Sequence, residues 1–232
     1  MRFRFLVVGF LLAIVTGTVL ARETILPMIT ESAPVTLHVT SGAVYWAALF
    51  NPAAPDTDAV HSVYEASSLQ DTTYTFTANE SALLDYPRTV DVTVSGTAAN
   101  IDVGTATITG TNSLDETITD TYSFTENTAG TLAGTKAFKT ISTLAVHQQD
   151  GANVHVSVGL GNDFGMPMTN LTNGVVFADV DGTRESTPPT VAVSGTAIES
   201  NTIAFNTAPN GTKDFSYVVL VSPYRVTTSD TR

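Results

Sequence analysis

The chain has 232 residues, the length of one large all-β domain or of two small ones. A hydrophobic share of 43% with a charged share of 14% excludes a disordered chain and is ample for a folded core. The formal net charge of -12 disfavours nucleic acid and anionic membranes as partners, because both repel acidic surfaces. Cysteine is absent, which excludes disulfides, thiolate catalysis and thiolate metal ligands.

Residues 1–21 form a signal-like hydrophobic segment. Two arginines open an apolar run, MRFRFLVVGFLLAI, and small residues then lead up to Ala21, as in a secretory signal peptide that is cleaved after this residue. Two alternatives stay open. The segment is an uncleaved anchor, although the run is short for a membrane span, or an upstream extension of a chain whose working start is Met28.

Residues 22–71 are predicted to form an extended N-terminal arm or the first strands. The stretch from Val35 to Phe50 alternates between polar and apolar residues and then becomes continuously apolar, which fits a strand followed by a buried strand or turn. The proline-rich stretch 51–58 is predicted to be a loop. For residues 60–69 we expect a short helix or an irregular arm.

From residue 72 onward the sequence alternates with the period of two that is typical of half-buried strands. Roughly one residue in six of the chain is threonine, whose branched side chain favours strands over helices. Gly, Asn, Asp and Pro fill the gaps, and Asp150-Gly151, Asp181-Gly182 and Asn210-Gly211 are turn signals, the last a strong hairpin signal. The predicted strands are 73–77, 89–94, 105–109, 117–125, 137–146, 154–160, 174–180, 190–193, 202–205 and 215–221.

Short strands separated by frequent turns predict an all-β fold, an antiparallel β-sandwich or jelly roll with an extended N-terminal arm. Residues 72–181 would form the main β-sandwich. The charged and proline-containing stretch DGTRESTPPT then marks a boundary, because two adjacent prolines do not fit a central strand. Residues 182–232 would supply C-terminal strands, either separate or part of the same sandwich. The lack of long periodic helices argues against α/β enzyme folds.

The histidines do not have the spacing of a zinc site. His147 and His155 would meet if Asp150-Gly151 closed a hairpin, but two solvated strand residues are the favoured interpretation. The carboxylates of Asp179, Asp181 and Glu185 are the alternative, a calcium site, because hard cations bind clustered oxygen atoms. Their spacing lacks the full calcium-loop signature, so a solvated turn is favoured.

The sequence contains no GxSxG motif of a serine hydrolase. The stretch GLGNDFG does not have the GxGxxG spacing of a dinucleotide-binding loop, and the Met166-Pro167 that follows does not favour a helix, so we interpret it as a turn. We therefore expect no enzymatic activity and no catalytic, cofactor-binding or metal-binding residue.

Three stretches of the sequence carry a resemblance to a known group of proteins. They are VDVTVSGTAANIDVGTATITGTNSLDETITDTYSF from Val90, GTKAFKTISTLAV from Gly134 and VHVSVGLGNDFGMP from Val154. These phrases resemble structural proteins of tailed bacteriophages, of the head-decoration or auxiliary-capsid kind. The stretch from Asp181 to Val221 resembles the end of such proteins. The signal-like N-terminus departs from the pattern expected of a virion protein made in the bacterial cytoplasm.

The resemblance implies a non-enzymatic virion protein that decorates or cements a phage capsid or tail, with the major capsid or tail protein as its partner. It also implies a homo-oligomer, most often a trimer, without cofactor or nucleic acid. The alternative is an exported surface or adhesion module that binds a glycan or a receptor. The chain contains a single tryptophan, which argues against a lectin, because a lectin-like site needs an aromatic platform for the sugar.

Two apolar segments are the candidate contact surfaces. In the N-terminal part, four side chains are candidates for contacts with a neighbour or shell, with an ordinary core role as the alternative. The predicted GNDFGMP loop is the second candidate, because its apolar residues would lie on a loop instead of a strand. The candidate interface residues are Tyr45, Trp46, Leu49 and Phe50, together with Phe164 and Met166.

Overall fold

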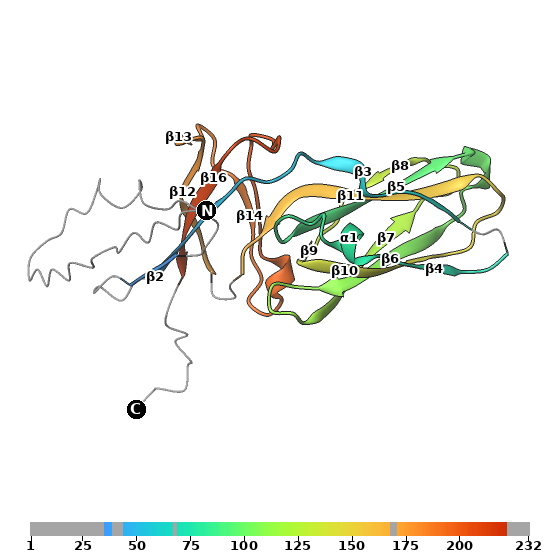
Figure 1. Cartoon of the computed structure of the whole chain (residues 1–232), viewed down its shortest axis with the longest axis horizontal. Helices are drawn as coiled ribbons and strands as arrows, with labels where there is room; N and C mark the ends of the chain where they lie inside the picture. The colour runs from blue at the N-terminus through green and yellow to red at the C-terminus, as the bar shows by residue number, and fades with distance from the viewer. Residues whose placement is uncertain (1–34, 39–43, 67–68, 168–170, 222–232) are drawn as a thin grey trace, which may run out of the picture. The chain divides into compact units, whose positions relative to one another are not determined.

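A computed structural model describes residues 35–38, 44–66, 69–167 and 171–221 of the chain (Figure 1). Internal contacts divide the chain into residues 1–31 and residues 32–232, and every described residue belongs to the second unit. The predicted signal-like segment 1–21 and most of the predicted arm therefore lie outside the described residues. Nearly all regular structure in the described part is β-strand, and every strand pairing is antiparallel, which confirms the predicted all-β fold.

The terminal sheet combines strands from the two ends of the described chain. Its strands, in spatial order, are β1 (Val35–His38), β2 (Val44–Phe50), β16 (Phe215–Val221), β12 (Leu171–Val180) and β13 (Thr183–Arg184). Asp181 and Gly182 join β12 to β13 with φ values of 53° and 71°. These left-handed values are typical of the tight hairpin turn that an Asp-Gly pair predicts.

The central sheet has seven strands. Its main order is β14 (Thr190–Ala192), β15 (Thr202–Ala204), β11 (Val154–Gly165), β5 (Arg88–Gly96) and β8 (Gly130–Leu132). In addition, β3 (Asp56–Glu65) pairs with β11, and β9 (Ala137–Phe138) pairs with β5. The long strand β11 therefore pairs with three strands, β15, β3 and β5, and Figure 1 shows it running beside β5 and β3.

The third sheet, here called the threonine sheet, contains four strands in the order β4 (Thr72–Thr75), β10 (Thr140–Val146), β6 (Gly104–Thr111) and β7 (Thr117–Phe124). Helical structure in the described residues is limited to single turns. These are α1 (Ala78–Ser81) and the 3-10 turns η2 (Ala98–Asn100) and η3 (Ile198–Ser200). No helix in the described part of the chain is long and apolar enough to cross a membrane.

The larger core lies between the central sheet and the threonine sheet. Alternate residues of β5 and β11, such as Val92 and Val156, are fully buried and belong to one cluster with Ile108 of β6 and Leu144 of β10. Each such side chain contributes about 1.5–3 kcal/mol by leaving water. The period-two pattern in the sequence thus produces a two-layer sandwich.

The smaller core joins the terminal sheet to the end of the central sheet. Phe215 and Tyr217 of β16 are fully buried in a cluster with Phe164 of β11 and Ile203 of β15. The predicted segments 22–71, 72–181 and 182–232 consequently share sheets. Strands of the first and third pair with each other in the terminal sheet, and β15 pairs with β11 in the central sheet.

Some local predictions were wrong. Residues 56–65 form strand β3 instead of a loop followed by a helix or irregular arm, and β11 continues through Gly165, so the predicted GNDFG turn is strand. Asp150-Gly151 does not close a hairpin, because β10 and β11 belong to different sheets. Asn210-Gly211 likewise forms a turn between strands of different sheets, with a φ of 77° at Gly211.

Candidate interaction surfaces

The outward face of the threonine sheet carries hydroxyl and methyl groups and no charge. Along β6 and β7 the inward residues that follow Gly104 are buried and every outward residue is half-buried or exposed, as the alternation of these strands requires. The outward positions of the four strands are Thr73, Thr75, Thr105, Thr107, Thr109, Thr111, Thr117, Thr119, Thr121, Ser123, Thr140, Ser142, Thr143 and Ala145. We call this set the threonine face.

The strand register aligns the threonine face into rows. Thr75 pairs with Thr143, which pairs with Thr109, which pairs with Thr119, so one row crosses all four strands. Neighbouring strands in a sheet lie about 4.8 Å apart, and alternate residues along one strand lie about 6.6 Å apart. The result is a regular array of short, branched side chains that lose little rotamer freedom when they are covered.

Direct hydroxyl contacts connect some of these rows. The hydroxyl groups of Thr107 and Thr121 lie 3.3 Å apart, and those of Thr111 and Thr140 lie 2.6 Å apart. Among the described residues, a further contact between two threonine hydroxyl groups joins Thr93 of β5 and Thr131 of β8 in the central sheet, at 2.8 Å. That second pair provides a natural comparison, because its surroundings are not part of the threonine face.

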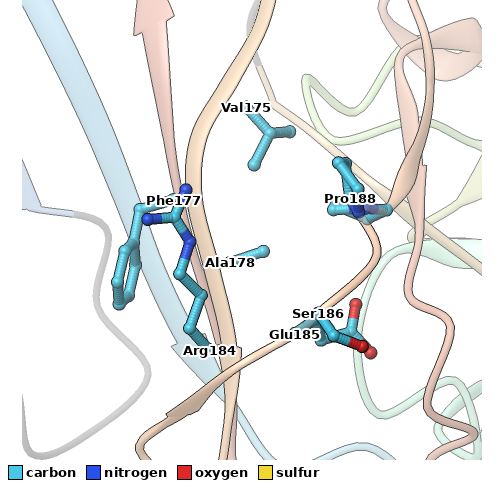
Figure 2. A pocket seen from close by; sticks show the side chains of 8 residues that line it. Val175, Phe177, Ala178, Arg184, Glu185, Ser186 and Pro188 are labelled. Atoms are coloured by element: carbon cyan, nitrogen blue, oxygen red, sulfur yellow. The ribbon is translucent and has the colours of Figure 1, made fainter.

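A pocket of about 420 Å³ lies beside strand β12. It is lined by Val175, Phe177, Ala178, Arg184, Glu185, Ser186, Pro188 and Pro189 (Figure 2). Figure 2 shows the Arg184 side chain beside Phe177, and its guanidinium carbon lies 5.9 Å from the ring centroid. This distance is within the range of a cation–π contact.

The two charges at this pocket have different surroundings. The Glu185 carboxylate accepts hydrogen bonds from the backbone N–H of Thr207 at 2.8 Å and of Asn206 at 3.3 Å, so the chain's own donors occupy it. Arg184 is exposed, and the described residues provide no carboxylate within 4.0 Å of its guanidinium. The pocket therefore presents a cation next to apolar side chains.

A polar cluster around Glu80 anchors the single helical turn α1. One Glu80 oxygen accepts from Tyr74 at 2.8 Å and lies 2.7 Å from Nδ1 of His61, while the other accepts from the backbone N–H of Thr77 at 2.7 Å. Burial alone would raise the pKa of Glu80, but the hydrogen bonds from Thr77, Tyr74 and His61 outweigh it and lower the pKa to about 2. Thr77 and Glu80 form a capping box, so this cluster has a structural explanation.

Three predicted interface residues are buried inside the subunit. Phe50 is 6% exposed, and its ring stacks on Tyr86 with centroids 4.4 Å apart. Phe164 and Met166 are fully buried, and Phe164 lies on strand β11 instead of a loop. These side chains contact the smaller core, so in this structure they are not available to a neighbouring molecule.

The other three predicted interface residues lie on β2, the strand that also carries Phe50. Leu49 is half-buried and pairs with Ser216 of β16. The backbones of Tyr45 and Trp46 pair with Leu220 and Val219 of β16. The side chains of Tyr45 and Trp46 lie outside the described residues, so their interface role stays a prediction.

The three carboxylates of the alternative calcium site each accept hydrogen bonds from donors of the chain itself. Asp179 accepts from the Ser216 hydroxyl at 2.8 Å, and Asp181 accepts from the backbone N–H of Asp214 at 2.9 Å. The described residues contain no group of three or more His, Asp or Glu side chains that could hold a metal ion.

His147 and His155 belong to different parts of the fold. His147 follows β10 and lies 2.9 Å from Asp71, whereas His155 is on β11 and pairs with Ser95. Both are half-buried. The contact across a hairpin at Asp150-Gly151 is therefore not formed.

The fold and these surfaces define an antiparallel all-β protein whose most regular feature is the threonine face. Comparison with protein-family models, with curated proteins and with solved structures finds no match to this chain.

Proposed function

We propose that this chain is a non-enzymatic virion structural protein that decorates or cements a phage capsid, or a tail, through protein–protein contacts. The sequence phrases that resemble phage head-decoration proteins support the proposal. In this role the protein acts as a homo-oligomer, a trimer in our proposal, on the major capsid or tail protein. It resides on the virion and needs neither cofactor nor nucleic acid.

The threonine face is the observation that carries the proposal. Covering charged groups without compensating partners costs several kcal/mol, and the centres of protein interfaces are accordingly depleted of charged residues. A chain with 22 acidic residues that keeps a four-stranded face free of charge has a surface suited to lie against another protein. The hydroxyl groups can still donate and accept hydrogen bonds across such a contact.

Co-sedimentation tests the proposal directly. The native producing culture is lysed, its particles are separated on a density gradient, and the chain is detected in each fraction. We expect the chain to band with the virions. Its recovery from a secreted or cell-surface fraction free of particles would contradict the proposal and favour the exported adhesion module.

A pair of matched variants tests the role of the threonine face. Thr121→Glu and Thr131→Glu each place one carboxylate on an exposed strand position and each remove a cross-strand hydroxyl pair. Only Thr121 lies on the threonine face. We expect Thr121→Glu to weaken binding to particles that lack the protein by at least about tenfold, because a charge is desolvated at the contact. Thr131→Glu should bind normally, and equal effects of both variants would contradict this assignment.

A further inference from the structure

The terminal sheet has two open edges within the described part of the chain. At one edge, β1 pairs only with β2. At the other edge, β13 covers only Asp179 and Val180 of the ten residues of β12. The outer side of β12 from Leu171 to Phe177 is therefore unpaired by any described strand. Unpaired edges expose backbone donors and acceptors that can pair with another chain.

Neither edge strand carries in its own sequence the lysine or proline residues that usually prevent such pairing. Monomeric proteins place lysine, proline or inward-pointing charges on edge strands. The sequence of β1 is VTLH, and the sequence of β12 is LTNGVVFADV. The single charged residue of β12, Asp179, lies in the part of the strand that pairs with β13. As far as the structure describes the chain, both edges are thus open to a partner strand.

We propose that the terminal sheet continues from one copy of the chain into the next, with β1 of one copy pairing antiparallel with β12 of its neighbour. This inference rests on the proposed function, since it names the contact that forms the homo-oligomer. The contact is head-to-tail, and such contacts form closed rings when the rotation between copies closes. A trimeric ring would leave none of these edges open.

Strand polarity favours this arrangement. The strands β1, β2, β16 and β12 are antiparallel in succession, so β1 and β12 of one copy run in opposite directions. A second copy added in the same orientation consequently places its β1 antiparallel to β12 of the first. Two-fold pairing of β12 with β12 would be antiparallel too, but it would leave both β1 edges open. With a single kind of contact, only the pairing of β1 with β12 satisfies both edges.

The pocket beside β12 provides space and charge for the incoming strand. Val175, Pro188 and Pro189 offer apolar contacts along the open edge, and Arg184 is a cation without a carboxylate partner among the described residues.

The absence of cysteine from the chain allows a direct test by cross-linking. Thr36→Cys on β1 is combined with Gly174→Cys or with Val175→Cys on β12 in the full-length chain. Two adjacent positions are used on β12 because successive side chains of a strand alternate between faces. A disulfide requires Cα atoms about 4.4–6.8 Å apart, so it reports neighbouring strands.

The expected result is that one of the two double variants forms covalent oligomers larger than a dimer after oxidation, while every single variant stays monomeric in denaturing gels. Dimers from a single variant on β12 would instead show two-fold pairing of this edge and overturn the proposal. A monomer in light scattering of the unmodified chain, or an oligomer that neither double variant cross-links, would overturn it as well.

Charge reversal provides a second readout. Arg184→Glu should raise the dissociation constant of the oligomer by on the order of tenfold, because it adds a carboxylate beside the pocket that the incoming strand would cover, where water is lost. Lys139→Glu is the control, because it makes the same change of charge at an exposed residue between β9 and β10, whose side chain is 44% accessible. It should leave assembly unchanged. These measurements use the isolated protein, so their failure is distinguishable from a failure to bind virions.

Discussion

The guanidinium group of Arg88 is fully buried and donates a hydrogen bond from Nε to the carbonyl oxygen of Gly161 at 2.9 Å. Nη1 donates to the Ala53 carbonyl at 3.1 Å and lies 3.3 Å from the Asp85 carboxylate. The group also lies 4.9 Å from the Phe164 ring centroid. Arg88 thus joins β5, β11 and the loop before β3 at a site between the two cores.

Replacing Arg88 should destabilise the subunit strongly. Burial lowers the pKa of Arg88 while Asp85 opposes that change, and an arginine stays protonated at neutral pH. In Arg88→Met the carbonyls of Gly161 and Ala53 lose their donors. We expect the free energy of unfolding in urea to fall by about 3 kcal/mol. Lys139→Met, which removes an exposed ion pair with Asp115, should cost less than about 1 kcal/mol. Equal losses would contradict this role.

The Glu80 cluster should make stability depend on pH in the acid range. The folded pKa of about 2 is below the ordinary value of 4.5, so the ionised form is favoured by folding. The stability that Glu80 provides is fully present above pH 4.5 and is lost as the pH falls from there toward 2. Because water reaches part of the site, we expect Glu80→Gln to cost on the order of 1–2 kcal/mol at pH 7. Urea unfolding should show this difference vanishing near pH 2.

A carboxylate without such donors serves as the control. Glu126 is exposed, and no donor among the described residues bonds its side chain. Glu126→Gln should change the free energy of unfolding by less than about 0.5 kcal/mol at pH 7. A difference between wild type and Glu80→Gln that is the same at pH 7 and pH 2 would show that shape, not charge, explains the effect.

The strands were predictable where one face is buried and the other exposed. In β7 the pattern of exposed and buried residues alternates without exception, and the sequence TITDTYSF shows the same period. Strand β3 was missed because it has no such period. Only Val60 is buried along its length, and its pairing with β11 has two register shifts. Contacts distant in sequence, not local pattern, determine this strand.

The candidate surfaces, like the strands, were predictable only in the part that a local sequence pattern determines. The abundance of threonine is visible in the sequence, but its collection on one face requires the register that joins β4, β10, β6 and β7. The buried hydrogen bonds of Arg88 could not be predicted from the sequence, because its partners Gly161 and Ala53 are distant along the chain. The open edge of β12 likewise depends on β13 ending after two pairs.

Phe50 and Leu49 separate a core role from a surface role. They are neighbours on β2, but Phe50 is buried against Tyr86 and Phe164, whereas Leu49 is half-buried. We expect Phe50→Ala to lower the free energy of unfolding by about 3–5 kcal/mol, because it leaves a cavity, without a direct effect on assembly. Leu49→Ala should cost about 1 kcal/mol or less. A lost oligomer with an unchanged melting temperature in Phe50→Ala would instead restore an interface role for Phe50.

Asp120 shows how the free edge of the threonine sheet is protected. Its side chain is 7% exposed and points inward from β7, where it accepts from the backbone N–H of Thr135 at 2.7 Å and of Lys136 at 3.1 Å. Lys136 in turn donates to the Thr119 carbonyl at 2.6 Å. These bonds hold residues 135–136 beside β7, the edge strand of the threonine sheet.

Asp120→Ala should therefore have two effects that a surface substitution lacks. The free energy of unfolding should fall by about 2 kcal/mol, because the backbone N–H groups of Thr135 and Lys136 lose their shared acceptor. The amides of Thr135 and Lys136 should exchange hydrogen faster, and the exposed edge of β7 should promote aggregation. Asp115→Ala, which removes an exposed carboxylate paired with Lys139, is the matched control and should change neither exchange at these amides nor solubility. Unchanged exchange in Asp120→Ala would show that other contacts hold this segment against β7.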